Sequence, residues 1–473
     1  MSCTHKPEVA RICAHVEDDT YLEAFTGRGV EYDLVCRACA DSGDRTTLSG
    51  ICADCVASLG GAVGRVGDPE ILIDDRLQIT YEEREVSFNG IDLQIVPVTG
   101  ACRDHWLGLE GNGRIFEVLD GTTTELARVD ITTPYGQPLA YTLHASRGAR
   151  FAAVVETKGV RGFIVELATG RTVPLVREDY HAEHCTFPFA FVERDGRVLY
   201  IWAPTWNRLD LVDAETGENL SARTFTHRDE ATPDDPAHYL DYFHCGLRVS
   251  PNARRFADNG WVWHPLGMVT TASIDAWLAN PFETEDGPTY KQLEWRDYWD
   301  GPIAWLDDDH IIMWGRGQDR EPIDAAEIHS AVTGKRVHWF AGPTWGRFFV
   351  DNRHLVIAAT FANDSNNYIE VWDLDRGHQL ADFVHNRINL CAFHPDAKLL
   401  ASNVLGGTMA ISHIISREAI ADERVAAIKA RRDVADLPIL GDLLEQLGLA
   451  DDRLIAHCRE SHTGDTCWVF DRI

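Results

Sequence analysis

Short stretches of alternating apolar and polar residues, each ending in a glycine turn, recur along most of the chain. In the clearest of them, residues 368–380, Ile369 and Val371 alternate with polar neighbours ahead of Gly377. Such alternation predicts a half-buried β-strand, and glycine readily takes the positive φ of the turn that follows. The same pattern ends at three further glycines, and a shorter version ends at a fourth: Gly170, Gly217, Gly334 and Gly121.

These turn glycines recur at a regular interval of about 40–50 residues. The longer interval from Gly217 to Gly334 holds one degenerate copy, residues 268–277, which lacks the glycine. A second motif, an apolar stretch that turns at a proline, occurs at residues 249–257 and 391–401. A repeat of this length with several short strands per copy predicts a β-propeller.

Trp372-Asp373 lies within the clearest repeat and connects it to a known family. Residues 368–380 resemble the strand-turn-strand core of a blade in WD-repeat β-propellers, whose name comes from this dipeptide. An excess of Arg over Lys, with abundant Ala, Asp and Gly, is typical of a bacterial chain. The resemblance implies a mainly β fold that serves as a platform for protein–protein interaction.

The blade count follows from the expected strand hairpins. Seven are centred near residues 105–119, 150–168, 197–213, 254–275, 309–331, 353–374 and 397–414, and an eighth lies at 454–470. We therefore expect eight blades, or seven if one hairpin is an appendage. The eighth hairpin lacks an outer strand, which the strands within residues 77–98 would supply. Closure of the ring in this way would remove exposed sheet edges.

Cysteines and histidines come in pairs near the N-terminus and predict a metal-binding module over residues 1–65. The eight candidate ligands are Cys3, His5, Cys13, His15, Cys36, Cys39, Cys52 and Cys55. A two-residue gap between thiolates lets both face one ion, and Zn²⁺ takes four such ligands in a tetrahedron. Eight ligands would fill two closed sites, so we expect two structural Zn²⁺ ions.

The pairing of these ligands stays open at the level of sequence. If the first pair joins the third and the second joins the fourth, the sites interleave as in a RING domain. Sequential pairing would instead give two separate knuckles. If Cys3 and His5 belong to a frayed terminus, only one site forms.

The remainder of the chain, residues 66–473, is expected to form the propeller. The glycine-rich stretch 60–69 predicts a linker ahead of it. Residues 416–450 break the strand pattern and predict a short helical insertion between blades. Within it, Leu440, Leu443, Leu444 and Leu447 form a helical stripe that we expect to pack on the propeller.

Charge and hydropathy restrict the partners. The 74 acidic and 44 basic residues give a formal charge of −30, which argues against nucleic acid or an anionic membrane as a partner. No apolar run is long enough to span a bilayer, and the first twenty residues lack the apolar core of a secretory signal. We expect a cytoplasmic protein with protein partners.

The usual catalytic signatures are missing from the sequence. It contains no G-x-S-x-G, no H-E-x-x-H, no phosphate-binding P-loop and no EF-hand. His181, Glu183 and His184 are metal-binding residue types. On a strand, however, His181 and Glu183 would face one side and His184 the other, so we expect no metal site there.

Seven of the fourteen tryptophans fall between residues 261 and 314. Such rings often fill the space between blades, but Trp, Tyr and Arg also dominate protein interfaces. We therefore predict a partner-binding face made by Trp261, Trp263, His264, Arg296, Tyr298 and Trp299. The function expected from the sequence is a non-enzymatic interaction scaffold. The alternative is an enzyme whose active site lies at the central channel.

Overall fold

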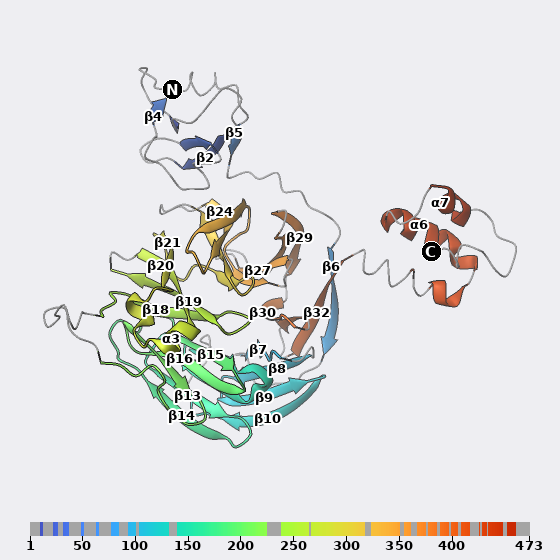
Figure 1. The fold of residues 1–473 in the computed structure, drawn as a ribbon. Coiled ribbons are helices and arrows are strands. Elements are labelled where there is room, and N and C mark those ends of the chain that lie inside the picture. Colours follow the sequence, from blue (N-terminus) through green and yellow to red (C-terminus); the bar gives the residue numbers. More distant parts are fainter. Residues whose placement is uncertain are drawn as a thin grey trace.

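The structure is a computed structural model, and it shows a body of β-sheets together with a short N-terminal sheet and C-terminal helices (Figure 1). The residues it describes are 10–12, 22–26, 32–36, 49–51, 63–65, 77–84, 93–100, 104–131, 140–224, 238–263, 266–316, 323–350, 354–360, 367–374, 377–385, 388–396, 399–404, 408–416, 425, 428–432, 434–447 and 452–459.

The N-terminal strands form one mixed sheet in the order β4-β1-β3-β2-β5. They are β1 (Ala10–Ile12), β2 (Leu22–Thr26), β3 (Tyr32–Cys36), β4 (Ser49–Ile51) and β5 (Val63–Arg65). β1 runs parallel to β3 and antiparallel to β4. β5 pairs with β2, so a strand occupies part of the stretch 60–69 that the sequence predicts to be a linker.

Consecutive antiparallel sheets form the propeller. Six of them have four strands each. The first two blades are β7 (Leu93–Pro97), β8 (His105–Glu110), β9 (Arg114–Leu119), β10 (Thr122–Arg128), and then β11 (Tyr141–Ala145), β12 (Phe151–Glu156), β13 (Arg161–Glu166), β14 (Arg171–Val176); the next two are β18 (Phe243–Val249), β19 (Arg255–Val262), β20 (Leu266–Ser273), β21 (Lys291–Arg296), and then β22 (Ile303–Trp305), β23 (His310–Arg316), β24 (Ile323–Ser330), β25 (Arg336–Ala341). The last two are β26 (Arg347–Val350), β27 (His354–Thr360), β28 (Asn367–Asp373), β29 (His378–His385), and then β30 (Ile388–His394), β31 (Leu399–Val404), β32 (Thr408–Ser416), β6 (Leu77–Arg84).

A three-stranded sheet lies between the second and third of these blades. It comprises β15 (Phe189–Arg194), β16 (Arg197–Thr205) and β17 (Arg208–Asp213). The expectation of eight, or seven, full blades is therefore wrong, because the described residues form six four-stranded blades and this shorter sheet. Where a fourth strand would lie, the described residues after β17 make one isolated bridge, from Asn219 to Val212.

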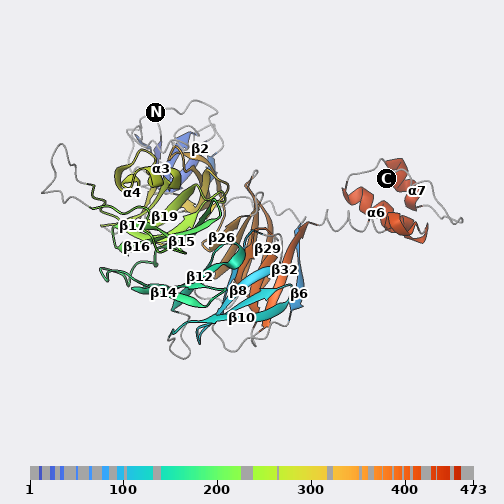
Figure 2. The same cartoon turned by 60° about the horizontal axis from the view of Figure 1, so that its bottom comes forward.

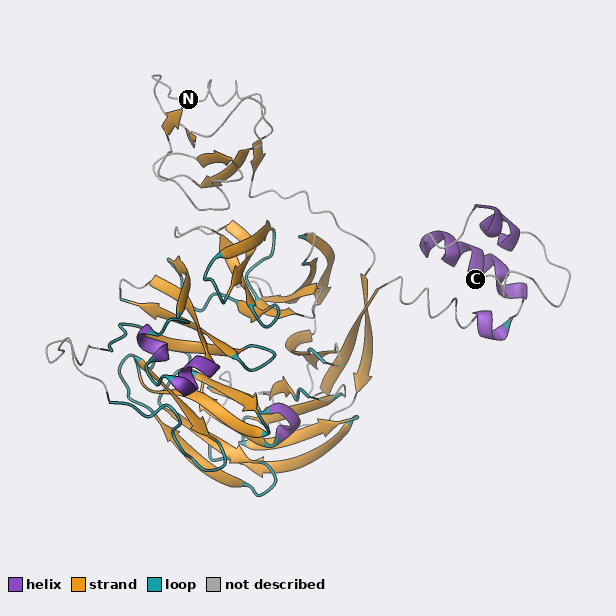
Figure 3. Ribbon diagram, viewed as in Figure 1, coloured by secondary structure: helices purple, strands orange, loops and turns teal. Residues whose placement is uncertain are grey.

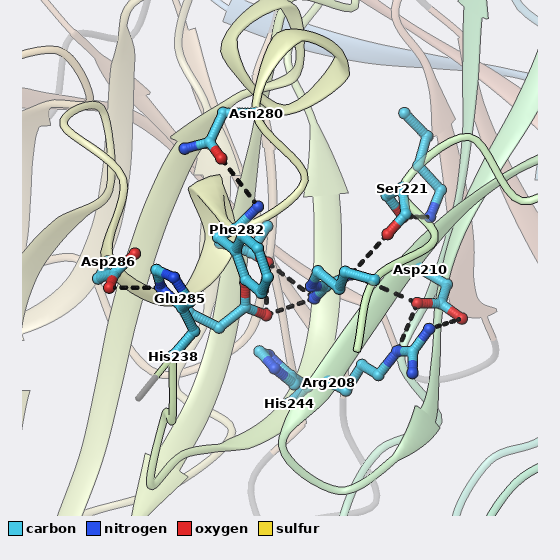
Figure 4. A network of polar contacts seen from close by, with 12 residues as sticks. Arg208, Asp210, Ser221, His238, His244, Asn280, Phe282, Glu285 and Asp286 are labelled. Atoms are coloured by element: carbon cyan, nitrogen blue, oxygen red, sulfur yellow. Dashed lines mark hydrogen bonds and ion pairs between the residues drawn. The ribbon is translucent and has the colours of Figure 1, made fainter. Parts of the chain in front are cut away.

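Polar side chains of the three-stranded sheet belong to a network of hydrogen bonds and ion pairs (Figure 4). Asp210 on β17 accepts hydrogen bonds from Arg208 Nε at 2.7 Å and Asn219 Nδ2 at 2.9 Å. Arg223, which is buried, pairs with Asp210 and with Glu285 of the short helix α4 (Glu283–Asp286). These contacts pair the charged side chains beside β17, and they join the three-stranded sheet to the next blade.

The first strand of each sheet is the inner one. Contacts between neighbouring sheets run along β7, β11, β15, β18, β22 and β26, and the series closes where β30 contacts both β28 and β7. The apolar core lies between the sheets. Leu107 and Leu109 of the first blade, for example, pack with Leu143 and Val154 of the second. Burial of apolar surface between blades is therefore what holds the ring together.

An N-terminal strand completes the last blade, as expected from the sequence (Figures 1 and 2). β6 pairs antiparallel with β32 from Leu77 opposite Ser416 to Arg84 opposite Met409. The expected acceptor of this strand was a hairpin at 454–470, but the acceptor is the hairpin that ends at Ser416. Residues 454–459 are helical instead, and residues 460–473 lie outside the described part.

The turn glycines behave as the repeat predicts. Gly170, Gly217, Gly334 and Gly377 have φ between 65° and 75°. The backbone N–H of each donates to the carbonyl four residues earlier, at 2.8–2.9 Å. In the degenerate copy the glycine turn is replaced by helix α3 (Ile274–Ala279), which Ser273 caps by accepting a hydrogen bond from the Ala276 N–H.

The helices near the C-terminus follow the last blade rather than interrupt the series (Figure 3). They are η2 (Val434–Asp436), α6 (Leu437–Leu447) and α7 (Asp452–Arg459); another short one, η1 (Arg147–Ala149), lies between β11 and β12. Leu440, Leu443 and Leu444 pack with Leu437 and Cys458 of these helices. These three leucines of the stripe expected to pack on the propeller are thus buried among the helices themselves. None of the helices within the described residues is long and apolar enough to cross a membrane.

Candidate protein-binding face

The strand order gives the propeller two different faces. The inner strands all begin at one face, here named the upper face, because the antiparallel order of a four-stranded blade returns the chain to this face after the outer strand. The connections β14–β15 and β21–β22, and the turns β16–β17 and β19–β20, therefore share this face. The connection β17–β18 begins at the opposite face, because its sheet has three strands, and it reaches the upper face where β18 begins. Side chains far apart in sequence meet there.

Aromatic side chains from these five connections, and from the start of β18 and the end of β19, form one contact network, here named the aromatic cluster. Its members are Tyr180, His181, Trp206, Tyr239, Phe243, Trp261, Trp263 and Trp299.

The base of the aromatic cluster is a buried stack. Phe243 stacks on Trp261 with ring centroids 3.8 Å apart, and Trp261 stacks on Trp299 at 4.7 Å. Trp206 lies 4.5 Å from Phe243 on another side. Phe243 and Trp261 are almost fully buried. Large stacked rings give this base rigidity at a low cost in side-chain entropy.

Three members of the cluster are exposed above this base. Tyr180 is 43% exposed, Tyr239 39% and Trp263 41%. Tyr180 contacts Trp263 edge-on at 6.4 Å, and both contact the buried Phe243. Large aromatic side chains held by a rigid base but left in water are typical of the central residues of protein interfaces.

Buried thiols support the cluster from below. Cys185 and Cys245 pack with Phe243 and Trp261. A hydrogen bond with the Cys245 thiol, assisted by Trp261 and the charge of Arg177, lowers the pKa of Cys185. Burial raises the pKa of Cys245 well above its usual range.

The residues expected to bind a partner divide into two groups. Trp261, Trp263 and Trp299 belong to the aromatic cluster. Arg296 and Tyr298 belong to a neighbouring group, in which both donate to the Trp314 carbonyl, at 2.6 and 2.8 Å. Because Trp261 and Arg296 are both only 4% exposed, they support the face rather than form its surface. His264 lies outside the described residues.

Sequence reasoning missed Tyr180, Trp206, Tyr239 and Phe243. Each lies in or beside a connection that reaches the upper face, but in the part of the chain before residue 261, where tryptophan is not dense. A search for aromatic residues in every predicted connection between blades would have found them.

The predicted zinc ligands fall mostly outside the described residues. Cys36 is the exception: it is the last residue of β3 and is buried. Cys3, His5, Cys13, His15, Cys39, Cys52 and Cys55 have no described position.

Comparison with known proteins names no family. No family model matches the chain, and no curated protein matches its sequence. Among solved structures, a chain in the crystal structure of the mitotic checkpoint complex aligns over 75% of this chain and 96% of its own length, at 10% identity and a TM-score of 0.45. A similarity this low indicates neither an activity nor a partner.

Proposed function

We propose that this chain is a non-enzymatic protein-interaction scaffold whose partner docks on the aromatic cluster. The observation that carries this proposal is the convergence of Tyr180, Tyr239 and Trp263, exposed aromatic residues from three separate connections, on one rigid base. Nearby charge favours a basic segment as the partner, because Glu183 and Asp300 are 64% and 41% exposed. Exposed Trp and Tyr rings also bind Lys and Arg through cation–π contacts.

The test is truncation of one exposed ring with a matched control. Trp263→Ala should weaken binding of a partner that co-purifies with the protein from its native host by at least about tenfold. Trp295→Ala is the control, because Trp295 is also 41% exposed but lies on the outer strand β21 and makes no ring contact with the aromatic cluster as far as the structure describes it. Equal binding by Trp263→Ala and the parent protein would contradict the proposal.

We also propose that residues 1–65 hold two structural Zn²⁺ ions. The strand register supports a pairing that neither sequence alternative includes. β1 and β3 run parallel with Ile12 opposite Leu34, so the chain leaves both strands at one end of the sheet. Cys13 directly follows Ile12, and Cys36 ends β3. This register favours one site made by Cys13, His15, Cys36 and Cys39.

The second site follows from the other neighbour of β1. β4 runs antiparallel to β1 with Ile51 opposite Ala10, so the chain leaves β4 at the end of the sheet where it enters β1. Cys52 directly follows Ile51. This register favours a second site made by Cys3, His5, Cys52 and Cys55, with the two sites nested in the sequence.

Elemental analysis of cysteine variants tests both the zinc and its pairing. After dialysis to remove weakly held ions, the full chain should carry about two equivalents of zinc, one per four-ligand site. Cys13→Ser and Cys36→Ser should each lose one equivalent, and the double variant should lose no more. Cys13→Ser combined with Cys52→Ser should lose both. Loss of both ions in the Cys13→Ser, Cys36→Ser variant would contradict the nested pairing.

A further inference from the structure

The connection between β14 and β15 brings together three metal-binding residue types. The ligand atoms of His181, Glu183 and His184 all lie within 4.8 Å of one another. The expected alternation along a strand does not occur, because the segment coils through successive turns. Ala182 N donates to the Asp179 carbonyl at 3.1 Å, and His184 N donates to the His181 carbonyl at 3.0 Å.

The turn that contains these three residues is anchored on its buried side. Ala182 and Cys185 are buried. The buried guanidinium of Arg177 donates to the carbonyls of both residues, at 3.2 and 3.4 Å, and lies over the Phe187 ring. The backbone positions of Glu183 and His184, between these two anchors, are thereby fixed while their side chains reach solvent.

His181 is held in an unusual conformation. Its φ of 54° lies in the left-handed region, which residues other than glycine seldom adopt. Its ring contacts Tyr180 at 4.6 Å and Trp263 at 5.1 Å, both edge-on. Strain of this kind is retained where the surrounding structure imposes it, and it is concentrated at functional sites.

We propose that His181, Glu183 and His184 bind a divalent transition-metal ion, with Zn²⁺ as the best match. Two imidazoles and one carboxylate are the protein ligands of open zinc sites, in which water or another ligand fills the fourth position. Tetrahedral zinc at ~2.05 Å from each ligand places its ligand atoms about 3.4 Å apart. The 3.3 Å from Glu183 Oε1 to His184 Nε2 already matches this separation.

The chemistry of the three ligands excludes the hard cations. Ca²⁺ takes six to eight oxygen ligands, whereas only one of these three residues supplies oxygen. A second group with similar spacing, Glu294, Glu327 and His329, is a poorer candidate. There, Glu327 is buried and already forms an ion pair with Arg336 at 3.0 Å, which a metal would have to displace.

The proposed site does not depend on partner binding. Glu183 and His184 are 64% and 55% exposed, so an ion enters directly from solvent. The ion would lie beside the exposed rings of Trp263 and Tyr180. If a basic segment of a partner docks on the aromatic cluster, as proposed above, a histidine imidazole of that segment would take the open position.

Cobalt titration of the full-length protein, dialysed until only the two zinc ions of residues 1–65 remain bound, tests the site. Co²⁺ should bind with one equivalent and give visible d–d absorption, but without the thiolate-to-cobalt charge-transfer band that the cysteine ligands of residues 1–65 would produce. Zn²⁺ should displace it. His184→Asn and Glu183→Gln should each weaken Co²⁺ binding at least tenfold while leaving the circular dichroism spectrum unchanged.

His310→Asn is the matched control. His310 is also partly exposed and lies 2.9 Å from a carboxylate oxygen of Asp307, but no third ligand joins the two within the part of the chain that the structure describes. It should leave Co²⁺ binding unchanged. An equal loss of Co²⁺ binding in His310→Asn would show unspecific surface binding. The proposal would be overturned if the parent protein bound no Co²⁺, or if all the Co²⁺ that it bound gave a thiolate charge-transfer band.

Discussion

At the scale of single residues, buried polar side chains fix the turns of the blades. Asp213, at the end of β17, is 4% exposed. Its carboxylate accepts hydrogen bonds from Thr216 N at 2.9 Å, Glu215 N at 3.0 Å and Arg197 Nη2 at 2.6 Å. Burial by itself would raise the pKa of Asp213, but hydrogen bonds from Thr216 and Arg197 outweigh it and hold the pKa below its usual value.

Asp213→Asn should make the free energy of unfolding less dependent on pH in the acidic range. A carboxylate whose pKa is lower in the folded state stabilises the fold above its unfolded pKa of about 3.9, and this stabilisation is lost as the pH falls through the folded pKa. The variant should therefore be less stable than the parent at pH 7, by about 1–3 kcal/mol, and the difference should shrink below about pH 4. Urea unfolding across this range measures it.

Glu218→Gln is the control for this experiment, because Glu218 is exposed in the same turn. It should follow the parent at every pH. A parent and an Asp213→Asn variant with parallel stability curves from pH 7 to about pH 2 would show that Asp213 does not contribute through its charge.

At the scale of elements, the glycine turns are the features that the sequence predicts best. Gly217 has a φ of 75°, and a Cβ there would meet no atom within 4 Å. Gly377 has a φ of 65°, but a Cβ there would lie 2.5 Å from Cβ of the buried Phe340. The sequence reveals the positive φ at both positions, because only glycine takes it cheaply. It does not reveal which of them is also crowded.

The two glycines should therefore respond differently to alanine. Gly217→Ala should lower the free energy of unfolding by about 1–2 kcal/mol, which is the cost of left-handed backbone alone. Gly377→Ala should lower it by about 1–3 kcal/mol more, because the added methyl group overlaps Phe340. Denaturant unfolding measures both. Asparagine tolerates the left-handed region, so the stability of Gly217→Asn should fall between that of Gly217→Ala and that of the parent. Equal losses of stability in Gly217→Ala and Gly377→Ala would refute the crowding argument.

The elements also show where local pattern fails. Leu454, Ile455 and Cys458 suggested a strand, but they lie in α7, where Ile455 and Cys458 are buried against the neighbouring helices. A short apolar run fits either structure, and the element available to pack against decides between them. The same applies to His181 and His184, which alternate on a strand but converge when the chain coils into turns.

At the scale of the whole molecule, closure of the ring depends on one strand from outside the series. β6 pairs with β32 over the whole of its length, from Leu77 to Arg84. Without it, β32 would be an exposed edge of the last blade, and exposed edges invite pairing with other chains. The contacts of β30 with β7 join the same two ends of the propeller from the inside.

Deletions on either side of β6 should therefore differ sharply. A variant that lacks residues 1–65 keeps β6 and should retain the melting temperature of the propeller. A variant that lacks residues 1–84 should melt at a lower temperature and aggregate more readily, because β32 is left unpaired. Thermal melting followed by circular dichroism, with light scattering to detect aggregates, compares the two. Identical melting temperatures of the two N-terminal deletions would refute closure by β6. As a further control, removal of residues 465–473 should leave the melting temperature of the propeller unchanged.

The sequence by itself determined the local structure of this protein. Alternation of apolar residues placed the strands, and glycines such as Gly170 and Gly334 placed their turns, because both signals act over a few neighbouring residues. Their repetition predicted a propeller and an N-terminal closing strand. Only the tertiary structure decided that β6 pairs with β32, that one sheet has three strands, and that Tyr180 meets Trp263. These depend on which distant segments the closed ring brings together, and no local pattern records that.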